Sequence, residues 1–190
     1  MSAEAIPSKT FDEYLAIEKE TGIKHEYYQG KVYAMTGASA RHNLIVSNII
    51  ASLHQQLRQS PCRVFPSDLR LQISQTGLYT YPDISVACGT LEFGSERPDT
   101  LLNSTCLIEV LSPSIENYDR GMKFEHYRTI SSLQIYLVIA QDRCHCELYL
   151  RQTDHRWLLI EFWSLEQTIQ LEAINAQLKL NDVYEYIELA

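Results

Sequence analysis

The stretches Tyr81-Pro82-Asp83-Ile84-Ser85-Val86-Ala87 and Cys106-Leu107-Ile108-Glu109-Val110-Leu111 decide the fold of this chain. Each is an apolar run of strand length that carries a single acidic residue, Asp83 in the first and Glu109 in the second. An ionised carboxylate inside a buried strand is costly unless it is paired or binds a cation. The two acids together indicate a metal site, although each could instead cap a strand end or pair with an arginine.

The segments on the N-terminal side predict two helices, a hairpin and a further strand. Apolar periodicity, capping signals and turn residues define these segments. In chain order they are a helix at 11–20, a β-hairpin of 25–28 and 31–35 that turns at Gln29-Gly30, a helix at 41–59, and a strand at 63–65 that continues through 69–73.

The segments on the C-terminal side predict a loop, a helix and an antiparallel meander. They are a polar loop at 89–104, a helix at 118–130, strands at 134–140, 144–150 and 157–163, and a short strand and helix within 178–187. Without its two ends, the chain therefore reads helix, strand, strand, strand, helix, strand. The two acids fall on the second and third of these strands.

Length and composition predict one domain over residues 1–190, with its core at about 41–140. A chain of 190 residues with 45% hydrophobic content has enough apolar surface for a buried core. No apolar run is long enough to span a bilayer, and the N-terminus lacks the basic start and apolar stretch of a signal peptide. We therefore expect a cytoplasmic protein without membrane contact.

The 5 cysteines lack the regular spacing of a disulfide framework, so reduced and largely buried thiols are expected. Cys144-His145-Cys146 has two thiols that would share one face of a strand, as a zinc pair does. No second ligand pair follows at structural-zinc spacing. A strand that carries two small apolar side chains is the alternative interpretation.

The net charge of -8 disfavours broad affinity for nucleic acid, because neutralisation of phosphates supplies most of that binding. The excess of acid lies in the flanking regions, whereas basic and acidic residues nearly balance over 41–128. The middle of the chain is therefore much less repulsive toward a polyanion.

An α-β-β-β-α-β core with Asp83 after a proline and Glu109 on the next strand resembles the PD-(D/E)XK, or restriction-endonuclease-like, superfamily. Over about residues 10–187 the chain is similar to the Uma2 family of bacterial endonucleases. The segments that carry this resemblance are Tyr14-Leu15, His25-Glu26-Tyr27, Gly30-Lys31-Val32, Met35, Gly37, His42-Asn43, Ser67-Asp68, Tyr81-Pro82-Asp83, Ile108-Glu109-Val110-Leu111-Ser112-Pro113-Ser114, Asp119-Arg120-Gly121-Met122-Lys123-Phe124, Tyr127 and Tyr136. The resemblance implies an α+β fold with a mixed sheet flanked by helices, preceded by a helix and hairpin and followed by an antiparallel meander.

The same resemblance implies a site for Mg²⁺ or Mn²⁺, with Asp83 and Glu109 as catalytic acids and metal ligands. The superfamily has a lysine two residues after the glutamate, but this chain has Leu111 there, as the Uma2 pattern does. Alternation directs residues 109 and 111 to one face of a strand, so the lysine has to come from elsewhere. Lys123 is the candidate; an ion pair with Asp119, four residues earlier, is the competing role.

Glu26 and His42 are further catalytic candidates. Glu26 could supply another carboxylate, and His42 could act as a base or contact a phosphate; structural roles are the alternative for both. Asp68 is expected in a bulge or turn. Alternatively, it could contribute an acidic group that surrounds the metal ligands without contacting the metal. Two groups of residues are assigned structural roles: Tyr127 and Tyr136 as core aromatics, and Ser112, Ser114 and Asp119 as residues that shape the turn after the third strand.

The function that these features predict is hydrolysis of DNA phosphodiester bonds by a metal-dependent endonuclease. The alternative is a nuclease fold that has lost catalysis and serves as a binding or assembly module; hydrolysis of another phosphate ester is a third option. The chain contains no helix-turn-helix or zinc finger, so loops such as 89–104 would have to contact DNA. Cleavage of both strands needs two sites, which favours a homodimer formed through the aromatic hairpin or the C-terminal meander.

Overall fold

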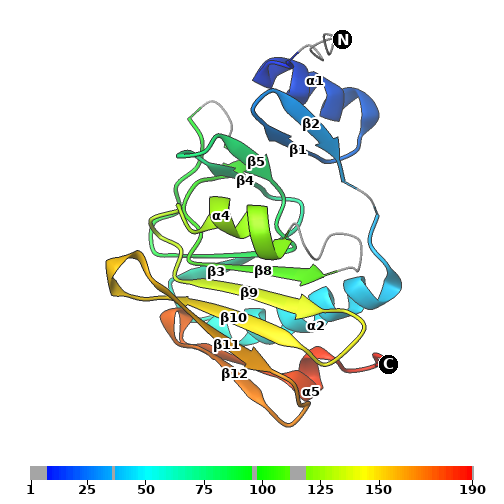
Figure 1. Cartoon of the computed structure of the whole chain (residues 1–190), viewed down its shortest axis with the longest axis vertical. Helices are drawn as coiled ribbons and strands as arrows, with labels where there is room; N and C mark the ends of the chain where they lie inside the picture. Colours follow the sequence, from blue (N-terminus) through cyan, green and yellow to red (C-terminus); the bar gives the residue numbers. More distant parts are fainter. Residues whose placement is uncertain (1–7, 36, 96–97, 112–118, 190) are drawn as a thin grey trace, which may run out of the picture.

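The computed structural model describes residues 8–35, 37–95, 98–111 and 119–189, which form a large sheet, a smaller sheet and a separate hairpin (Figure 1). The helices are α1 (Phe11–Thr21), α2 (Ala40–Leu57), the π-helical turn η1 (Asp119–Lys123), α4 (Phe124–Tyr127), α5 (Leu180–Val183) and the 3₁₀ turns η2 (Thr153–His155) and η3 (Glu172–Ile174). The strands are β1 (His25–Tyr28), β2 (Lys31–Ala34), β3 (Cys62–Pro66), β4 (Arg70–Ile73), β5 (Leu78–Thr80), β6 (Ile84–Cys88), β7 (Thr100–Leu101), β8 (Cys106–Leu111), β9 (Ile135–Ala140), β10 (Cys146–Arg151), β11 (Trp157–Phe162), β12 (Thr168–Leu171) and β13 (Ala176–Lys179).

The large sheet has the strand order β11-β10-β9-β8-β6-β3. Strands β3, β6 and β8 are successively antiparallel, β8 and β9 are parallel, and β9, β10 and β11 form the antiparallel meander. The parallel pair requires a crossover, and η1 with α4 lies in that connection. With α2 before β3, this is the predicted α-β-β-β-α-β order, so the fold expectation is confirmed.

Both faces of the large sheet are covered, because successive side chains of a strand point to opposite faces. On one face, α2 buries Ile45, Ile49 and Leu53 in a cluster that includes Ile108 and Val110 of β8. The other face of β8 carries Leu107 and Leu111, which belong to a second apolar cluster around Tyr127 and Tyr136. Glu109 lies between these two leucines and therefore points away from α2.

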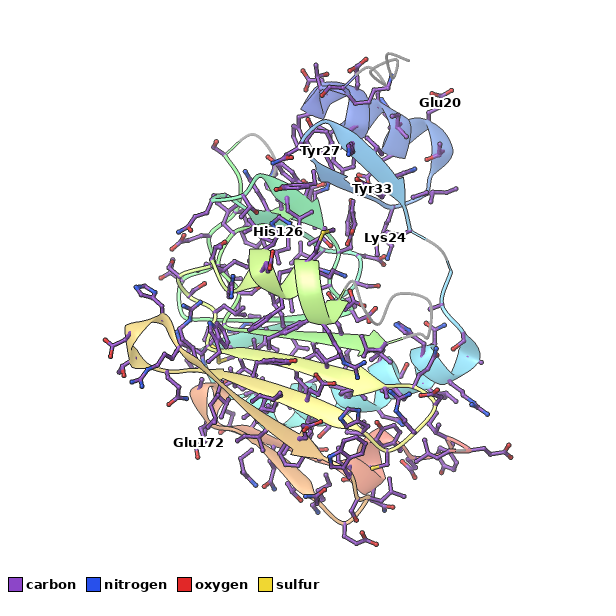
Figure 2. All side chains as sticks on the ribbon, viewed as in Figure 1. Glu20, Lys24, Tyr27, Tyr33, His126 and Glu172 are labelled. Carbon is purple, nitrogen blue, oxygen red and sulfur yellow. A yellow bond between two sulfur atoms is a disulfide. The ribbon has the colours of Figure 1, made fainter. Side chains whose placement is uncertain are left out.

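The smaller sheet has the order β2-β1-β5-β4-β7 and lies with α1 above the large sheet in Figure 1. Thr10 caps α1 through the predicted capping box, and Gly22 ends the helix in the left-handed conformation. In the hairpin turn both Gln29 (φ 48°) and Gly30 (φ 77°) have positive φ, which matches the twist of the flanking strands. At the lower end of this unit (Figure 2) the Lys24 ammonium lies 3.1 Å from the Asp68 carboxylate.

Three of the predicted elements differ in the structure. The strand expected to continue from 63 through 73 is wrong, because the chain turns at 67–69 and passes from β3 in the large sheet to β4 in the smaller one. Asp68 lies in this turn with its side chain 87% exposed, as one of its two predicted roles requires. The loop at 89–104 contains β7, which pairs in parallel with β4, and the helix expected at 118–130 is limited to η1 and α4.

The expectation that all cysteines are reduced is also wrong, because Cys62 and Cys88 form a disulfide. The two residues lie directly opposite each other in the antiparallel pair of β3 and β6. The disulfide joins residues that are 26 positions apart, and their spacing in the sequence did not predict it. Cys144 and Cys146 are free thiols, and His145 between them lies 3.1 Å from the Glu161 carboxylate.

The C-terminal part adds the β12-β13 hairpin and α5 to the face of the large sheet that α2 covers. Ile169, Leu171 and Leu178 of this hairpin are buried in the same cluster as Ile45 and Ile49. The predicted short strand and helix correspond to β13 and α5, whereas β12 was not expected. Among the described residues, no helix has the length and apolar character needed to cross a membrane.

Candidate active site

Asp83 and Glu109 lie side by side at the edge where β6 begins. The antiparallel register pairs Ile84 with Ile108, so one further step places Asp83 opposite Glu109. The Val110 N–H donates to Asp83 Oδ2 at 2.8 Å, and the Asp83 N–H donates to Glu109 Oε2 at 3.4 Å. Glu109 on β8 and Asp83, the residue before β6, are distant in sequence, and the register of these strands brings their carboxylates together.

Lys123 approaches these acids from the π-helical turn η1. Its ammonium lies 3.0 Å from Glu109 Oε1 and its side chain is only 5% exposed. Leu111 shares the face of Glu109 but is buried in the apolar cluster of that face. Extra residues in a helical turn often occur at functional sites, and here η1 holds the buried side chains of Asp119 and Lys123 in one turn.

Glu26 and His42 reach this group of side chains from two other elements, Glu26 through Lys123 and His42 through Asp83. Glu26 comes from β1 of the smaller sheet; its Oε1 lies 3.5 Å from the Lys123 ammonium and accepts a 2.5 Å hydrogen bond from the Thr80 hydroxyl. His42 comes from the first turn of α2, and its Nε2 lies 3.0 Å from Asp83 Oδ2. The structure therefore brings together all five side chains proposed as catalytic from the sequence.

Asp119 joins the same group, although the sequence suggested for it only a turn or an ion pair with Lys123. That ion pair forms, with Asp119 Oδ1 3.2 Å from the Lys123 ammonium. The Asp119 side chain is 1% exposed, so this ion pair is buried. The sequence feature that could have placed Asp119 in the site is its spacing of four residues from Lys123. The turn-shaping role expected for Ser112 and Ser114 falls on 112–118, outside the described residues.

Tyr127 and Tyr136 are core aromatics, as expected, and each also donates a hydrogen bond at the site. The Tyr127 hydroxyl donates to Glu109 Oε1 at 2.7 Å, and the Tyr136 hydroxyl donates to the Asp119 backbone oxygen at 3.0 Å. Both rings are fully buried. They fix the orientation of the Glu109 side chain and the position of η1 from the apolar side.

Acidic groups outnumber basic groups in this buried cluster. Burial, opposed by Lys123 and reinforced by Asp83 and Asp119, raises the pKa of Glu109 to about 8. Burial likewise raises the pKa of Asp119. Burial alone would lower the pKa of Lys123, but Glu109, Tyr127, Asp119 and Glu26 together raise it well above its usual range. A cluster with one ammonium and several carboxylates has the charge that a divalent cation would neutralise.

The oxygen donors of the cluster fit Mg²⁺ or Mn²⁺ as a partly hydrated ion. Glu109 Oε1 is engaged by Tyr127 and Lys123, whereas from the described residues Glu109 Oε2 accepts a single long hydrogen bond, from the Asp83 N–H at 3.4 Å. Over the described part of the chain, no three His, Cys, Asp or Glu side chains form a group that could hold a metal ion by themselves. The Cys144-His145-Cys146 segment therefore has no such group around it among the described residues either. Mg²⁺ is commonly held by one or two carboxylates together with water, so two protein carboxylates suffice.

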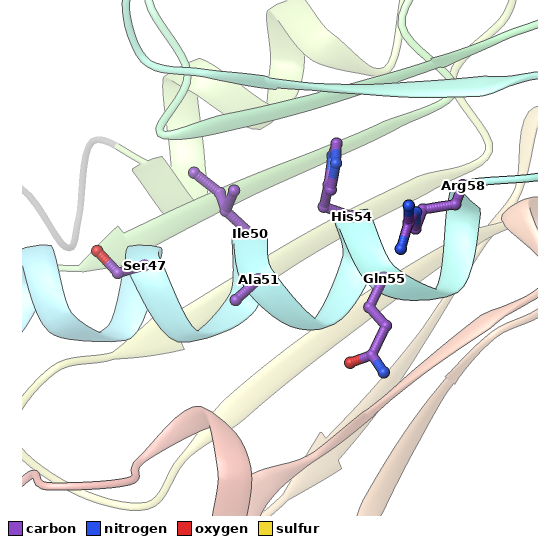
Figure 3. Close-up of a pocket in the computed structure, with 6 residues that line it drawn as sticks. All are labelled: Ser47, Ile50, Ala51, His54, Gln55 and Arg58. Atoms are coloured by element: carbon purple, nitrogen blue, oxygen red, sulfur yellow. The ribbon is translucent and has the colours of Figure 1, made fainter.

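A separate pocket of about 540 Å³ lies on the surface of α2 (Figure 3) and contains no acidic side chain. Its walls are side chains from successive turns of the helix, namely Ser47, Ile50, Ala51, His54, Gln55 and Arg58. None of these residues belongs to the acid cluster, so the pocket is not the place where the carboxylates would act.

Known proteins resemble this chain over nearly its whole length. "Uncharacterized protein slr1290" of Synechocystis is 34% identical over 94% of this chain and 92% of its own length. A second Synechocystis protein, "Uncharacterized protein sll1609", is 36% identical over 80% of this chain and 86% of its own.

A solved structure from Anabaena variabilis, described as a "putative nuclease", superposes with a TM-score of 0.75 over 92% of this chain and 97% of that one. At 21% identity this match shows the shared fold. The model of the Uma2 family, described as "Putative restriction endonuclease", matches residues 11–182. The chain, with its restriction-endonuclease-like fold, therefore belongs to the Uma2 family.

Proposed function

We propose that this protein is a metal-dependent endonuclease that hydrolyses phosphodiester bonds of DNA. The observation that carries the proposal is the placement of Asp83 opposite Glu109, with the Lys123 ammonium 3.0 Å from Glu109. Two carboxylates and one ammonium in this arrangement have the chemical groups of the superfamily site, even though the lysine comes from η1. Membership of a family described as "Putative restriction endonuclease" supports a nucleic-acid substrate.

Each residue of the cluster has a role in this proposal. Asp83 and Glu109 would hold Mg²⁺ or Mn²⁺, which supplies charge neutralisation at the phosphate and lowers the pKa of bound water. Lys123 orients the attacking water or a phosphate oxygen through its ammonium. His42 lies at the more accessible side, 13% exposed and bonded to Asp83, where it can accept a proton or contact the phosphate. Glu26 holds the Lys123 ammonium in place from the smaller sheet.

Nicking of supercoiled plasmid in Mg²⁺ or Mn²⁺ tests the proposal. We expect Asp83→Asn and Glu109→Gln to remove the activity, because each substitution removes a charged oxygen ligand while it keeps the shape of the side chain. Asp68→Asn is the matched control, since this aspartate is 87% exposed in a turn and pairs with Lys24. Equal nicking by wild type and the two site variants would reject the assignment.

Metal binding can be measured without DNA. Titration calorimetry with Mn²⁺ is expected to show one site per chain that Asp83→Asn and Glu109→Gln weaken and that Asp68→Asn leaves intact. A residual heat that is the same in all four proteins would place the metal elsewhere.

The alternative is a nuclease fold that acts as a binding or assembly module. Two observations favour it: Leu111 occupies the usual lysine position, and the acidic excess of the chain lies in its flanking regions, which would repel a polyanion. A wild-type protein that binds neither metal at millimolar concentration and does not nick DNA would support this module. Metal binding that depends on Asp83 would count against it.

We also propose that the protein acts on duplex DNA as a homodimer. Strand β11 ends the large sheet and exposes Leu158 (48%), Leu159 (46%) and Ile160 (36%), so the meander offers an apolar edge for a second copy. Light scattering coupled to gel filtration is expected to give twice the chain mass, and Leu159→Glu is expected to return it to the monomer value. A wild-type monomer at micromolar concentration would reject this part of the proposal.

A further inference from the structure

A buried hydrogen-bonded cluster around Glu18 lies beside the acid cluster and has no part in the roles above. The side chains of Glu18 and Arg70 are 10% and 8% exposed, and Arg70 Nη2 donates to Glu18 Oε2 at 2.5 Å. The Tyr81 hydroxyl lies 3.0 and 2.9 Å from the two Glu18 oxygens. One carboxylate of α1 therefore joins β4 and the segment that follows β5.

This cluster also holds the backbone next to Glu26. The His25 N–H donates to Glu18 Oε1 at 2.8 Å, and the His25 carbonyl accepts from the Tyr14 hydroxyl at 3.1 Å. Arg70 Nε donates in turn to the Tyr14 oxygen at 3.1 Å. Both polar backbone atoms of the residue before Glu26 are thus fixed by side chains of α1.

The other side of the cluster fixes the segment that carries Asp83. Residues 80–83 lead from β5 of the smaller sheet into β6 of the large sheet. Within this segment, the Thr80 hydroxyl bonds to the Glu26 carboxylate and the Tyr81 hydroxyl bonds to Glu18, two positions before Asp83. Glu18 therefore links the segment that carries Glu26 to the segment that carries Asp83. It bonds to the His25 N–H, next to Glu26, and to the Tyr81 hydroxyl, two positions before Asp83.

We propose that Glu18, through Arg70 and Tyr81, is a positioning residue that sets the Glu26 carboxylate against the Lys123 ammonium. This inference rests on the proposed function, because Glu26 matters only as part of that site. Charge-assisted hydrogen bonds are short and directional, so a buried Glu18 paired with Arg70 fixes geometry better than apolar packing does. Loss of one of these bonds lets the hairpin with Glu26 shift relative to η1.

Tyr81→Phe tests this role with the loss of a single oxygen. Tyr27→Phe is the matched control, because Tyr27 directly follows Glu26 in β1 and its hydroxyl bonds, among the described residues, to the exposed Lys9 carbonyl; Figure 2 shows Tyr27 in the hairpin. Under single-turnover nicking we expect Tyr81→Phe to be about 10- to 100-fold slower, as small displacements in active sites are, and Tyr27→Phe to be unchanged. Glu18→Gln is expected to follow Tyr81→Phe.

A double-substitution cycle separates positioning from a purely structural role. In a Glu26→Gln background the Tyr81→Phe substitution is expected to have no further effect on the rate, because the group that it positions is already neutral. If Tyr81→Phe slows Glu26→Gln as much as it slows wild type, the proposal is overturned.

A second readout does not depend on nuclease activity, so failure of the proposed function would not hide the result. The ammonium of a lysine as buried as Lys123 exchanges slowly enough to be observed in ¹H–¹⁵N spectra. Glu26→Gln and Tyr81→Phe are expected to shift this resonance in the same direction, and Tyr27→Phe is expected to leave it in place. An unshifted resonance in Tyr81→Phe overturns the proposal, whether or not wild type cleaves DNA.

Discussion

Replacement of Lys123 by methionine would remove the only ammonium from the described part of the acid cluster while it keeps a side chain of similar length. The Lys123 nitrogen lies 3.0 Å from Glu109, 3.2 Å from Asp119 and 3.5 Å from Glu26. Removal of one partner from a buried ion pair costs about 3–5 kcal/mol, because the remaining charge stays buried without compensation. We therefore expect Lys123→Met to lose about 3–5 kcal/mol of unfolding free energy near pH 8.

The loss should depend on pH with a definite sign. Burial raises the pKa of Glu109 and Asp119 above their unfolded values, and Lys123 opposes this rise, so both pKa values increase further in the variant. A carboxyl group with a raised pKa in the folded state destabilises that state as pH rises above the unfolded pKa, because the unfolded chain releases the proton more readily. The destabilisation is expected to be largest near pH 8–9 and to shrink toward pH 5, because the Glu109 carboxyl, with a pKa of about 8, is already protonated there in the folded protein.

Urea unfolding of wild type and variant at pH 5, 7 and 9 measures this effect, with a single cooperative transition expected for one domain. Lys31→Met is the control, because Lys31 is an exposed hairpin residue and its loss should change stability by at most about 0.5 kcal/mol. A Lys123→Met loss that is below about 1 kcal/mol, or equal at all three pH values, would refute the picture of one ammonium holding several buried acids.

Three further outcomes are expected from the fold. Thr10→Ala removes the side-chain acceptor of the α1 capping box and should lower the unfolding free energy by about 1 kcal/mol, measured by urea titration. Reduction of the Cys62–Cys88 disulfide, whose cysteines are 26 positions apart, should lower it by about 3.5 kcal/mol in the chain-entropy model; an unchanged melting temperature in dithiothreitol would contradict the pairing. Burial raises the pKa of the Cys106 thiol, so in a thiol-labelling time course the half-buried Cys144 should react first and Cys106 only on unfolding.

Much of the architecture was predictable because its signals are local. The capping box at Thr10, the turn at Gln29-Gly30 and the apolar periodicity of α2 each act over a few residues and specify one helix or hairpin. The apolar run of β8 was predicted with its observed bounds, since strand length and burial are both visible in the sequence. Local patterns were insufficient where a segment changes sheets, as at 67–69, since the partner of a strand is chosen by the rest of the fold.

For the candidate site too, local features were visible in the sequence and long-range contacts were not. The presence of Asp83 and Glu109 in apolar strands marked them from the sequence, because a buried charge needs an explanation that an exposed one does not. Asp119 was assigned only to a turn or a local ion pair, although it is as buried as the other acids. The disulfide was missed because it depends on the register of β3 and β6, which only the assembled sheet fixes.

The sequence by itself determined the helix-strand-strand-strand-helix-strand order of the core, the identity of Asp83 and Glu109 as the acids of two apolar runs, and the absence of lysine at position 111. Only the tertiary structure decided that Lys123 reaches Glu109 from η1 and that Glu26 arrives from a separate sheet. The physical reason is the sequence separation over which each interaction acts. Capping, turn and periodicity signals act between neighbours in the chain. The convergence of Glu26, Asp83, Glu109 and Lys123 requires strand register, a crossover and the packing of two sheets to be in place together.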